Sequence, residues 1–442
     1  EFVELQLQIQ TRRKKFESAA KALPCSGDNH LIKPFLAKLA FKLTNAQTRV
    51  LREIRANLGG AHPMRRLLQG DVGSGKTAVA ACAALMALES GFNVALMAPT
   101  EILAEQHYRN FVRWLEPLGV TVEMRTGTKK TSNGQSTRTH VAHRTSSATL
   151  FVGTHALLSS GFSIPRLGLV IIDEQHRFGV AQREQLVRKG NYPHLLVMTA
   201  TPIPRTLGLT LYGDLDVSVI DELPPGRGRV KTFVRTSEKL PQVWEFVRRQ
   251  LAASRQVYVV YPRVEENSDG LKAVTKEFAT LSQQLAPYRV GLLHGRVRPA
   301  EKEAVMADFR ANRLQVLLAT SLIEVGVDVP NATVMVIENA ETFGLAQLHQ
   351  LRGRIGRGAQ ESFCILISDA QEPETRERLE VLEQTTDGFR IAEADLKLRG
   401  PGELLGQQQS GLPNFRFGAL VSDLPLVRQA REIAAAQLAA KD

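Results

Sequence analysis

Residues 67–77, Leu-Leu-Gln-Gly-Asp-Val-Gly-Ser-Gly-Lys-Thr, decide the fold of this chain. The two leucines are typical of the end of a buried strand, and the apolar stretch 78–87 that follows is typical of a helix. Between them, the spacing Gly70-x-x-x-x-Gly75-Lys76-Thr77 matches a phosphate-binding loop. Backbone N–H groups at a helix N-terminus can surround a polyphosphate there, because glycine leaves no side chain in the way. The stretch therefore predicts a nucleoside triphosphate site at a strand–helix junction.

The loop positions have distinct expected roles. Lys76 is expected to reach the β- and γ-phosphates, and the Thr77 hydroxyl to ligate Mg²⁺. A glycine-rich turn that matches by chance is the alternative, and the strand–turn–helix context argues against it. The residues expected to line the nucleotide are Gly70, Asp71, Val72, Gly73, Ser74, Gly75, Lys76 and Thr77.

The composition is that of an ordinary globular protein, with 43% hydrophobic and 23% charged residues in 442. No apolar run approaches the roughly 18 residues that span a bilayer. The cysteines Cys25, Cys82 and Cys364 fit no zinc or redox spacing, so we expect a cytoplasmic setting, with Cys82 and Cys364 in the core. The net charge of +11 favours polyanion partners. Since the first residue is Glu1, we expect a fragment of a longer protein.

The first twenty residues predict an amphipathic helix over 2–20. A basic cluster, Arg12-Arg13-Lys14-Lys15, lies away from its apolar positions. We interpret the cluster as a solvated face, with a nucleic-acid contact as the alternative. After a break at 24–29, a second helix is expected over 44–57.

The remainder of the chain predicts two α/β domains. Apolar strands alternate with helical patterns from 67 to 220, which indicates a parallel sheet covered on both faces. Pro224-Pro225-Gly226 is typical of a linker. A second alternation without a phosphate loop follows it, and 126–148 is expected to be a surface loop with at most a weak helix. The expected strands are 94–98, 149–152, 169–172, 195–198, 256–261, 289–293, 315–318, 333–337 and 362–367, and the expected helices of the second half are 271–285, 299–311, 345–352, 374–384 and 424–440.

Two carboxylates, Asp173 and Glu174, follow the apolar strand 169–172. Ligands of parallel sheets bind at the carboxyl ends of the strands, where these side chains are expected. We expect Asp173 to hold Mg²⁺ through water and Glu174 to polarise the water that attacks the γ-phosphate. An acidic strand end without a role is the alternative.

Thr199-Ala200-Thr201 ends the next strand. If the two strands are neighbours, the threonine hydroxyls are expected near His176. A hydrogen bond between His176 and Thr199 or Thr201 would then report the nucleotide state to the rest of the protein. The alternative is a satisfied polar strand end.

The stretch 347–358, Gln-Leu-His-Gln-Leu-Arg-Gly-Arg-Ile-Gly-Arg-Gly, places three arginines among glycines. Packing alone explains this poorly, because the guanidinium is a fixed fork of donors suited to phosphate. Arg354 and Arg357 are expected to act as arginine fingers on the γ-phosphate. A basic surface loop is the alternative.

Taken together, Gly70–Thr77, 173–176, 199–201, 319–328 and 350–357 resemble the motifs of superfamily-2 helicases. Within that group, 173–180, 198–206 and 344–354 are most similar to the RecG family of bacterial DNA helicases. The resemblance runs from about residue 36 to the C-terminus. It implies two tandem RecA-like domains with ATP between them and a helical translocation element.

The resemblance also implies further site residues. Gln47 resembles an adenine-reading glutamine, and Gln350 belongs to the same motif as the two arginine fingers. Residues 387–406 resemble a helical hairpin and loop that couple ATP hydrolysis to movement on double-stranded DNA, with Arg399 in the coupling role. The expected DNA contacts are Pro99, Thr100, Glu101, Gly153, Thr154, His155, Thr320 and Ser321, and the motif linking nucleotide and DNA continues to Gly326 and Asp328.

We therefore divide the chain into a linker helix and loop (1–35), a first RecA-like domain (36–222), a second (223–375) and a helical translocation element (376–442). The resemblance implies an ATP- and Mg²⁺-dependent 3′–5′ DNA helicase that remodels forks and Holliday junctions, with branched DNA as its partner. Single-stranded DNA-binding protein is a candidate protein partner, and a monomer associated with the nucleoid is expected. An ATP-gated nucleic-acid clamp, an RNA helicase and a transcription-repair-coupling translocase are the alternatives.

Three departures from the family stand out. Gln407-Gln408 occupies a place where the family usually has Thr-Arg, which leaves the coupling loop without one charge. The loop 126–148 is richer in Ser and Thr than expected. Nothing in the chain resembles the wedge domain that splits forks, and the helix at 2–20 would be the linker that leaves it.

Overall fold

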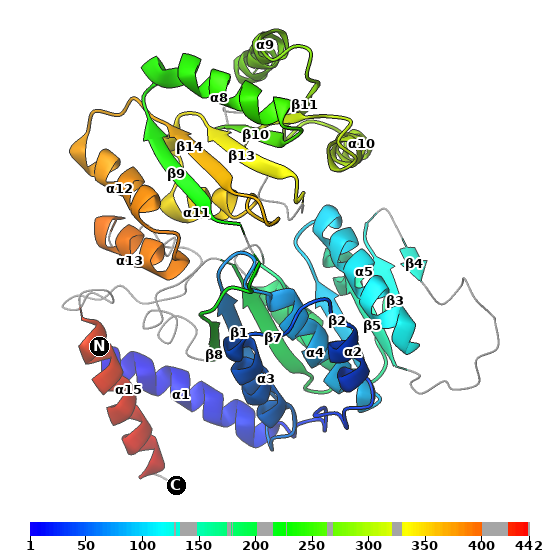
Figure 1. Cartoon of the computed structure of the whole chain (residues 1–442). Helices are drawn as coiled ribbons and strands as arrows, with labels where there is room; N and C mark the ends of the chain where they lie inside the picture. The colour runs from blue at the N-terminus through cyan, green and yellow to red at the C-terminus, as the bar shows by residue number, and fades with distance from the viewer. Residues whose placement is uncertain are drawn as a thin grey trace. The chain divides into compact units, whose positions relative to one another are not determined.

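The computed structural model describes residues 1–127, 130–132, 148–174, 178, 180–200, 215–226, 228–262, 268–320, 329–399 and 423–440. The chain forms two compact units, which Figure 1 shows with their helices and strands labelled. The first combines Glu1–Pro224 with Arg399–Asp442, and the second is Pro225–Leu398. Each contains one sheet covered by helices, so the α/β class expected from the sequence is confirmed. The four-part domain division remains a prediction.

The first unit is built on an eight-stranded sheet with the order β4-β3-β5-β2-β6-β7-β1-β8. Every neighbouring pair is parallel except β3 and β4. The carboxyl ends of the parallel strands therefore share one edge, which we call the carboxyl edge. The strands are β1 (Arg65–Gly70), β2 (Asn93–Met97), β3 (Thr121–Arg125), β4 (Lys130–Ser132), β5 (Thr149–Gly153), β6 (Leu167–Ile172), β7 (His194–Thr199) and β8 (Asp216–Ile220).

Helices cover both faces of this sheet because successive strand residues point to opposite sides. Leu68 and Ile171 pack with residues of α3 and α4 on one face. Leu67 and Ile172 pack with residues of α6 and the short helix η3 on the other. The helices are α1 (Phe2–Ala19), α2 (Ile32–Lys38), α3 (Asn45–Leu58), α4 (Lys76–Glu89), α5 (Glu101–Leu115), η1 (Glu116–Leu118), η3 (His155–Leu158), α6 (Val180–Val187) and α15 (Leu424–Ala439).

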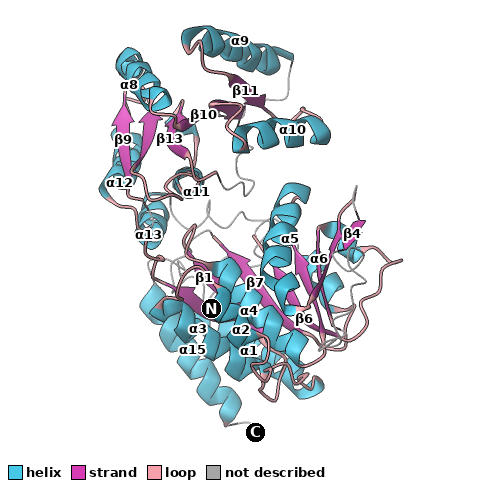
Figure 2. Cartoon of the chain, turned by 45° about the vertical axis from the view of Figure 1, so that its right-hand side comes forward, coloured by secondary structure: helices cyan, strands magenta, loops and turns pink. Residues whose placement is uncertain are grey.

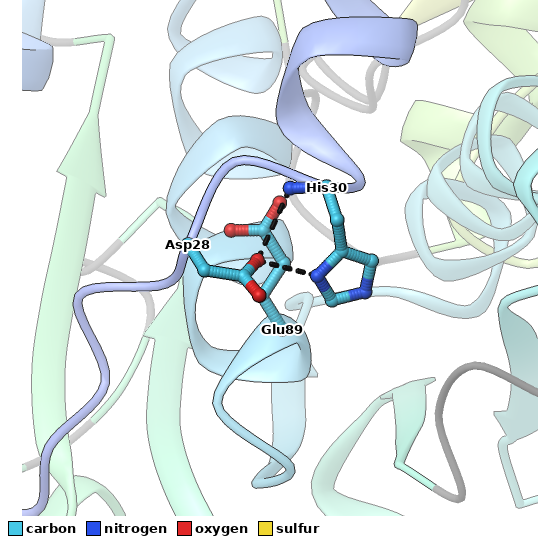
Figure 3. A group of neighbouring side chains, drawn as sticks. All are labelled: Asp28, His30 and Glu89. Atoms are coloured by element: carbon cyan, nitrogen blue, oxygen red, sulfur yellow. Dashed lines mark hydrogen bonds and ion pairs between the residues drawn. The ribbon is translucent and has the colours of Figure 1, made fainter.

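The segment before α2 is anchored to the end of α4. The Glu89 carboxylate accepts hydrogen bonds from the backbone N–H groups of Asn29, Leu31 and Ile32 at 3.0, 2.6 and 2.8 Å. Figure 3 shows Glu89 beside Asp28 and His30, a set with the ligand types of a metal site. Because the Glu89 oxygens already accept three backbone N–H groups, we interpret the group as an anchor for α2.

A buried histidine holds the segment before α2 to the edge of the sheet where the parallel strands begin, opposite the carboxyl edge. His194, at the start of β7, donates from Nε2 to the Leu23 carbonyl (2.7 Å) and accepts at Nδ1 from the Met64 N–H (2.9 Å). Burial lowers the pKa of His194, although the Leu23 carbonyl partly opposes this. The neutral ring is therefore the form that joins the segment to the sheet.

The first and last helices, α1 and α15, pack together, as both views in Figures 1 and 2 show. Lys14 on α1 donates to the Leu438 carbonyl at 2.9 Å. Arg13 forms an ion pair with Asp216 at 2.9 Å. The expectation of a solvated basic face is wrong for these two residues, because α15 and β8 supply acceptors that the local sequence does not reveal.

The second unit has a six-stranded, wholly parallel sheet with the order β11-β12-β10-β13-β14-β9. Val259 packs with residues of α8 and α9 on one face, while the ring of Tyr258 lies 5.1 Å from that of Phe309 in α10 on the other. The elements are β9 (Val230–Arg235), η5 (Ser237–Lys239), α8 (Leu240–Ala252), β10 (Gln256–Tyr261), α9 (Ser268–Gln284), β11 (Val290–Leu293), α10 (Pro299–Arg310), β12 (Val316–Thr320), β13 (Ala332–Ile337), η7 (Ala340–Thr342), α11 (Leu345–Arg352), β14 (Ser362–Ile367), α12 (Pro373–Gln384) and α13 (Gly388–Arg399).

All the strands and helices named from the sequence are present, with ends that differ by a few residues. The expected loop 126–148 is wrong at β4, an edge strand in which Lys130–Ser132 pairs antiparallel with β3. Polar Ser and Thr residues are compatible with an edge strand, because one side of it faces water; 133–147 lie outside the described residues.

Cys82 and Cys364 are buried as expected. None of the helices in the described ranges is long and apolar enough to cross a membrane.

Candidate active site

The phosphate-binding loop connects the end of β1 to the start of α4. Gly73 and Gly75 have left-handed backbones, with φ of +79° and +85°, which favour glycine. A Cβ atom at Gly75 would lie 2.2 Å from Nε2 of Gln47, and one at Gly70 would lie 2.5 Å from Oγ of Ser74. The backbone conformation therefore favours glycine at 73 and 75, and the close packing of the loop favours it at 70 and 75.

Lys76, the first residue of α4, folds its ammonium group back over the loop. Nζ donates to the carbonyls of Gly70 and Asp71 at 2.7 and 2.9 Å. Thr77, the next residue, is partly exposed at the same helix N-terminus. A cation, a helix N-terminus and a loop without bulky side chains together fit a polyphosphate.

Gln47 braces the loop from α3. Its side chain is fully buried, and Nε2 donates to the Ser74 carbonyl at 2.7 Å. Its Oε1 accepts from the Thr44 N–H, while Thr44 in turn accepts from the Gln47 N–H, so the two residues form a capping box. The amide of Gln47 is therefore engaged with the protein, and adenine reading remains a prediction.

Asp173 follows β6 at the carboxyl edge, and its N–H donates to the Met97 carbonyl at the end of β2 (3.0 Å). Its Oδ2 lies 2.8 Å from Nε2 of His107 on α5. Burial alone would raise the pKa of Asp173, but the hydrogen bond with His107 and the nearby Lys76 ammonium hold it below its usual value. Asp173 is thus an ionised carboxylate close to the phosphate-binding loop.

Glu174 connects the ends of β6 and β7. Its backbone is left-handed (φ +51°), a strained state for a residue other than glycine. Its N–H donates to Oδ1 of Asp173 at 3.0 Å, and its Oε2 accepts from the Ala200 N–H at 3.4 Å. β6 and β7 are neighbours, which is the condition for the expected contact between His176 and the threonines. Thr199 is buried at the end of β7, whereas His176 and Thr201 lie outside the described residues.

The residues expected to contact DNA in the first unit lie along the same edge. Pro99 precedes α5, Thr100 caps it by accepting from the Leu103 N–H (3.3 Å), and Glu101 is its first residue. Gly153 ends β5, and its carbonyl accepts from the Ala98 N–H (2.8 Å), so these two strand ends are adjacent. The same edge carries the other two expected contacts, Thr154, which is buried and caps η3, and His155, which is exposed.

In the second unit, the expected catalytic residues occupy α11 and the turn after it. Gln350 is partly exposed, Arg354 is 8% exposed, and Arg357 is partly exposed with Nε 3.4 Å from the Gly353 carbonyl. Thr320 ends β12 and is buried. Ser321, Gly326 and Asp328 lie outside the described residues, as does the side chain of Arg399, although its backbone ends α13.

Arg352, the first arginine of this stretch, is a packing residue. It is 3% exposed, and Nη1 donates to the carbonyls of Leu382 and Thr385 at 2.8 and 2.9 Å. Nη2 lies 2.9 Å from Nδ1 of His349. The argument that packing poorly explains all three arginines is therefore wrong for Arg352, because the end of α12 supplies buried carbonyls that need a donor.

A second unusual carboxyl lies at the carboxyl edge of the second sheet. Glu338 follows β13, is 8% exposed and donates its N–H to the Val260 carbonyl at 2.9 Å. Burial, with the charges of Glu277, Asp369 and Glu341, raises the pKa of Glu338 to about 7.

Sequence reasoning missed His107 and Glu338, and it missed the packing role of Arg352. His107 shares the spacing of Leu103, Ala104 and Phe111 on the buried face of α5. A histidine in an apolar helical stripe is the signal that could have identified it. The sequence carries no comparable signal for Glu338.

Comparison with known proteins agrees with this geometry. Residues 44–209 match the family described as DEAD/DEAH box helicase, 238–359 the helicase conserved C-terminal domain, and 385–442 ATP-dependent DNA helicase RecG, domain 3, C-terminal. The ATP-dependent DNA helicase RecG of a Synechocystis strain is 52% identical over 98% of this chain, and that of Acidithiobacillus ferridurans is 51% identical over 95%. The chain belongs to the RecG family.

A solved structure of a RecG protein bound to a three-way DNA junction matches 97% of the chain with 44% identity and a TM-score of 0.76. This agreement, together with the two sheets, supports the tandem RecA-like architecture. The chain spans 52% and 61% of the two RecG relatives and 56% of that structure's chain.

Proposed function

We propose that this chain is the motor region of a RecG-type helicase, which hydrolyses ATP to ADP and phosphate to move on double-stranded DNA. One observation carries the proposal. Lys76, Asp173 and Glu174 lie at the carboxyl edge of one parallel sheet, with Asp173 held ionised beside the Lys76 ammonium. This arrangement provides a phosphate cradle, a metal-binding carboxylate and a second carboxylate for the attacking water.

The residues have separate roles in this proposal. The loop and Lys76 bind the phosphates, and Glu174 orients the water, with its position maintained by the contact with Ala200. Arg354 and Arg357 of the second unit neutralise charge on the γ-phosphate when the two units close around ATP, with Gln350 beside them. Opening after phosphate release completes one step of movement.

The donors at the site suit Mg²⁺. Thr77 offers a hydroxyl and Asp173 a carboxylate, and Mg²⁺ prefers oxygen ligands. A bound Mg²⁺ would stabilise negative charge on the phosphates. The divalent ion is thus expected to be held by Thr77 and Asp173 directly or through water.

Branched DNA is the proposed substrate, because a RecG structure in the comparison contains a three-way DNA junction. Forks and Holliday junctions, a 3′–5′ polarity, a partnership with single-stranded DNA-binding protein, a monomeric state and a cytoplasmic, nucleoid-associated location complete the proposal. The expected DNA contacts are the strand ends at 99–101, 153–155 and 320–321. Residues 376–442 are proposed as the translocation element, with Arg399 and His176 in coupling.

Phosphate release with and without forked DNA tests the proposal. DNA should stimulate ATPase activity, and Lys76→Ala or Arg357→Ala should abolish it. Normal turnover in both variants without DNA would contradict an ATP-driven motor. An ATP-gated clamp would bind DNA in an ATP-dependent way without stimulated turnover, and stimulation by RNA instead of duplex DNA would indicate an RNA helicase.

A further inference from the structure

The side chain of His107 is fixed against Asp173. The Nε2–Oδ2 distance is 2.8 Å, and the two side chains are 5% and 13% exposed, so water has little access to the bond. An ionised carboxylate only accepts hydrogen bonds, so Nε2 carries the proton and donates it. The other oxygen, Oδ1, accepts from the Glu174 N–H at 3.0 Å. Each oxygen of the Asp173 carboxylate therefore has its own donor, and together these donors fix its orientation.

Among the described residues, the bond to Asp173 is the hydrogen bond that the imidazole ring of His107 makes. The ring lies 6.3 Å from that of Phe111, one turn further along the buried face of α5. Its Nδ1 is buried and has no hydrogen-bond partner among the described residues. Since a buried polar atom without a partner is unfavourable, a histidine here needs a compensating role. The bond to Asp173 supplies one.

The helix that carries His107 begins among the expected DNA contacts. Thr100 caps α5 and Glu101 is its first residue, and an α-helix rises about 1.5 Å per residue, which places His107 about 9 Å further along the axis. The strand before α5 also reaches the same carboxylate residue, because the Met97 carbonyl accepts from the Asp173 N–H at 3.0 Å. One main-chain bond and one side-chain bond therefore connect this segment to Asp173.

We propose that His107 is a positioning residue that orients Asp173 for the divalent ion and transmits displacement of the amino end of α5 to that carboxylate. The first part concerns residues that touch each other in this structure. The second part rests on the proposed function, because it takes DNA at Thr100 and Glu101 as the source of the displacement.

Three variants of the chain test the proposal. His107→Phe removes the donor and keeps an aromatic ring against Phe111. His107→Gln restores an N–H donor near the place of Nε2. Phe111→Leu is the matched control, since it alters packing on the same face of α5 and leaves the bond intact. Two quantities are measured for each: the Mg²⁺ concentration for half-maximal binding of a fluorescent ATP analogue without DNA, and the ratio of ATPase rates with and without forked DNA.

Loss of a residue that orients a metal ligand typically changes metal affinity or activity by about 10- to 100-fold. His107→Phe is therefore expected to raise the Mg²⁺ requirement at least about 10-fold and to lower the DNA-stimulated ATPase ratio by a similar factor. His107→Gln should stay within about 3-fold of the unmodified chain for both quantities, because it keeps the donor. Phe111→Leu should match the unmodified chain.

Two results would overturn the proposal: unchanged values in His107→Phe, or a defect in His107→Gln as large as that in His107→Phe. If His107→Phe does not fold, His107→Gln decides alone, because the proposal requires it to be close to the unmodified chain. Absence of DNA stimulation in the unmodified chain would contradict the proposed function and the transmission part. The Mg²⁺ titration would still test the orienting part.

Discussion

The carboxyl edges of the two sheets have the same topology and opposite electrostatics. At the first edge, Asp173 is partly buried beside His107 and Lys76, which hold its pKa below the usual value. At the second edge, burial of Glu338 and the charges of Glu277, Asp369 and Glu341 raise its pKa to about 7. A carboxyl is therefore ionised on one sheet and largely protonated below neutral pH on the other.

The difference shows that the neighbouring side chains, and not the strand arrangement, determine whether a carboxyl at the sheet edge is ionised. Both sheets place a carboxyl after a buried strand, at β6 and at β13. The first has cations and a phosphate-binding loop nearby. The second has a surplus of negative charge, which is unfavourable for phosphate and favours the uncharged acid.

The largest expected effect comes from removing the cation that defines the first edge. Lys76→Ala should lower the ATPase kcat by at least about 100-fold, because it deletes charge stabilisation at the phosphates. Steady-state phosphate release measures this. Lys231→Ala, on β9 of the second sheet, is the matched control, because Lys231 pairs with Glu361 at the surface. An equal decrease of the ATPase kcat in Lys76→Ala and Lys231→Ala would show that a cation at the first sheet matters no more than one at the second.

The second test separates two arginines of one stretch in the second unit. Arg352→Met should lower the free energy of unfolding by about 3 kcal/mol, because the carbonyls of Leu382 and Thr385 lose a buried charged donor. Arg357→Met should leave the free energy of unfolding nearly unchanged and abolish DNA-stimulated ATPase activity. Urea titration and phosphate release on both proteins measure the two effects.

If Arg357→Met unfolds as easily as Arg352→Met, the assignment of one arginine to packing and the other to phosphate is wrong. The same holds if Arg352→Met is as stable as the unmodified chain.

The third test concerns Glu338 and pH. Because its pKa in the folded protein is raised from 4.5 to about 7, folding favours the protonated form. Its stabilising contribution is fully present below pH 4.5 and is lost as pH rises through about 7. Glu338→Gln, which mimics the protonated acid, should therefore raise the free energy of unfolding at pH 8 by about 2 kcal/mol and have little effect at pH 5.

Thermal unfolding at the two pH values measures this difference. Glu380→Gln, an exposed change on α12 of the same unit, is the control. A Glu338→Gln variant that is no more stable at pH 8 would mean that the second edge does not hold a protonated carboxyl.

The smallest expected effect concerns His194, at the edge of the first sheet where the parallel strands begin. The pKa of His194 is lowered from 6.5 by burial, so below pH 6.5 the unfolded chain binds a proton that the folded chain excludes. Stability should thus fall as pH falls through 6.5 and be independent of this group above it. His194→Gln should reduce that acid sensitivity in thermal unfolding, and an unchanged pH profile would contradict it.

Sequence alone predicted the features that depend on local pattern. The loop glycines and Lys76 follow from spacing within one strand–turn–helix segment. The carboxylates Asp173 and Glu174 follow from their place directly after an apolar strand. The pairing of His107 with Asp173 joins residues 66 positions apart. It depends on the angle at which α5 packs on the sheet, which a periodic pattern does not contain.

Other features were missed for related reasons. Glu338 has its raised pKa because packing in the fold buries it and brings Glu277 and Asp369 near it from other elements. β4 is a short polar edge strand, and its composition is that of a loop. Arg352 belongs to a stretch that favours phosphate binding, and only the position of α12 shows that its guanidinium is used within the fold.

The packing of α1 against α15 has a consequence for biosynthesis. The first unit begins with α1 and is completed by α15, while the second unit lies between them in chain order. The ribosome synthesises the chain from its amino end, so about four hundred residues separate the synthesis of α1 from that of its packing partner α15. The residues Val427, Ala430 and Ala434 are buried on α15. A nascent chain therefore carries α1 without its partner helix until α15 has been synthesised, and a premature stop before residue 424 would remove that partner permanently.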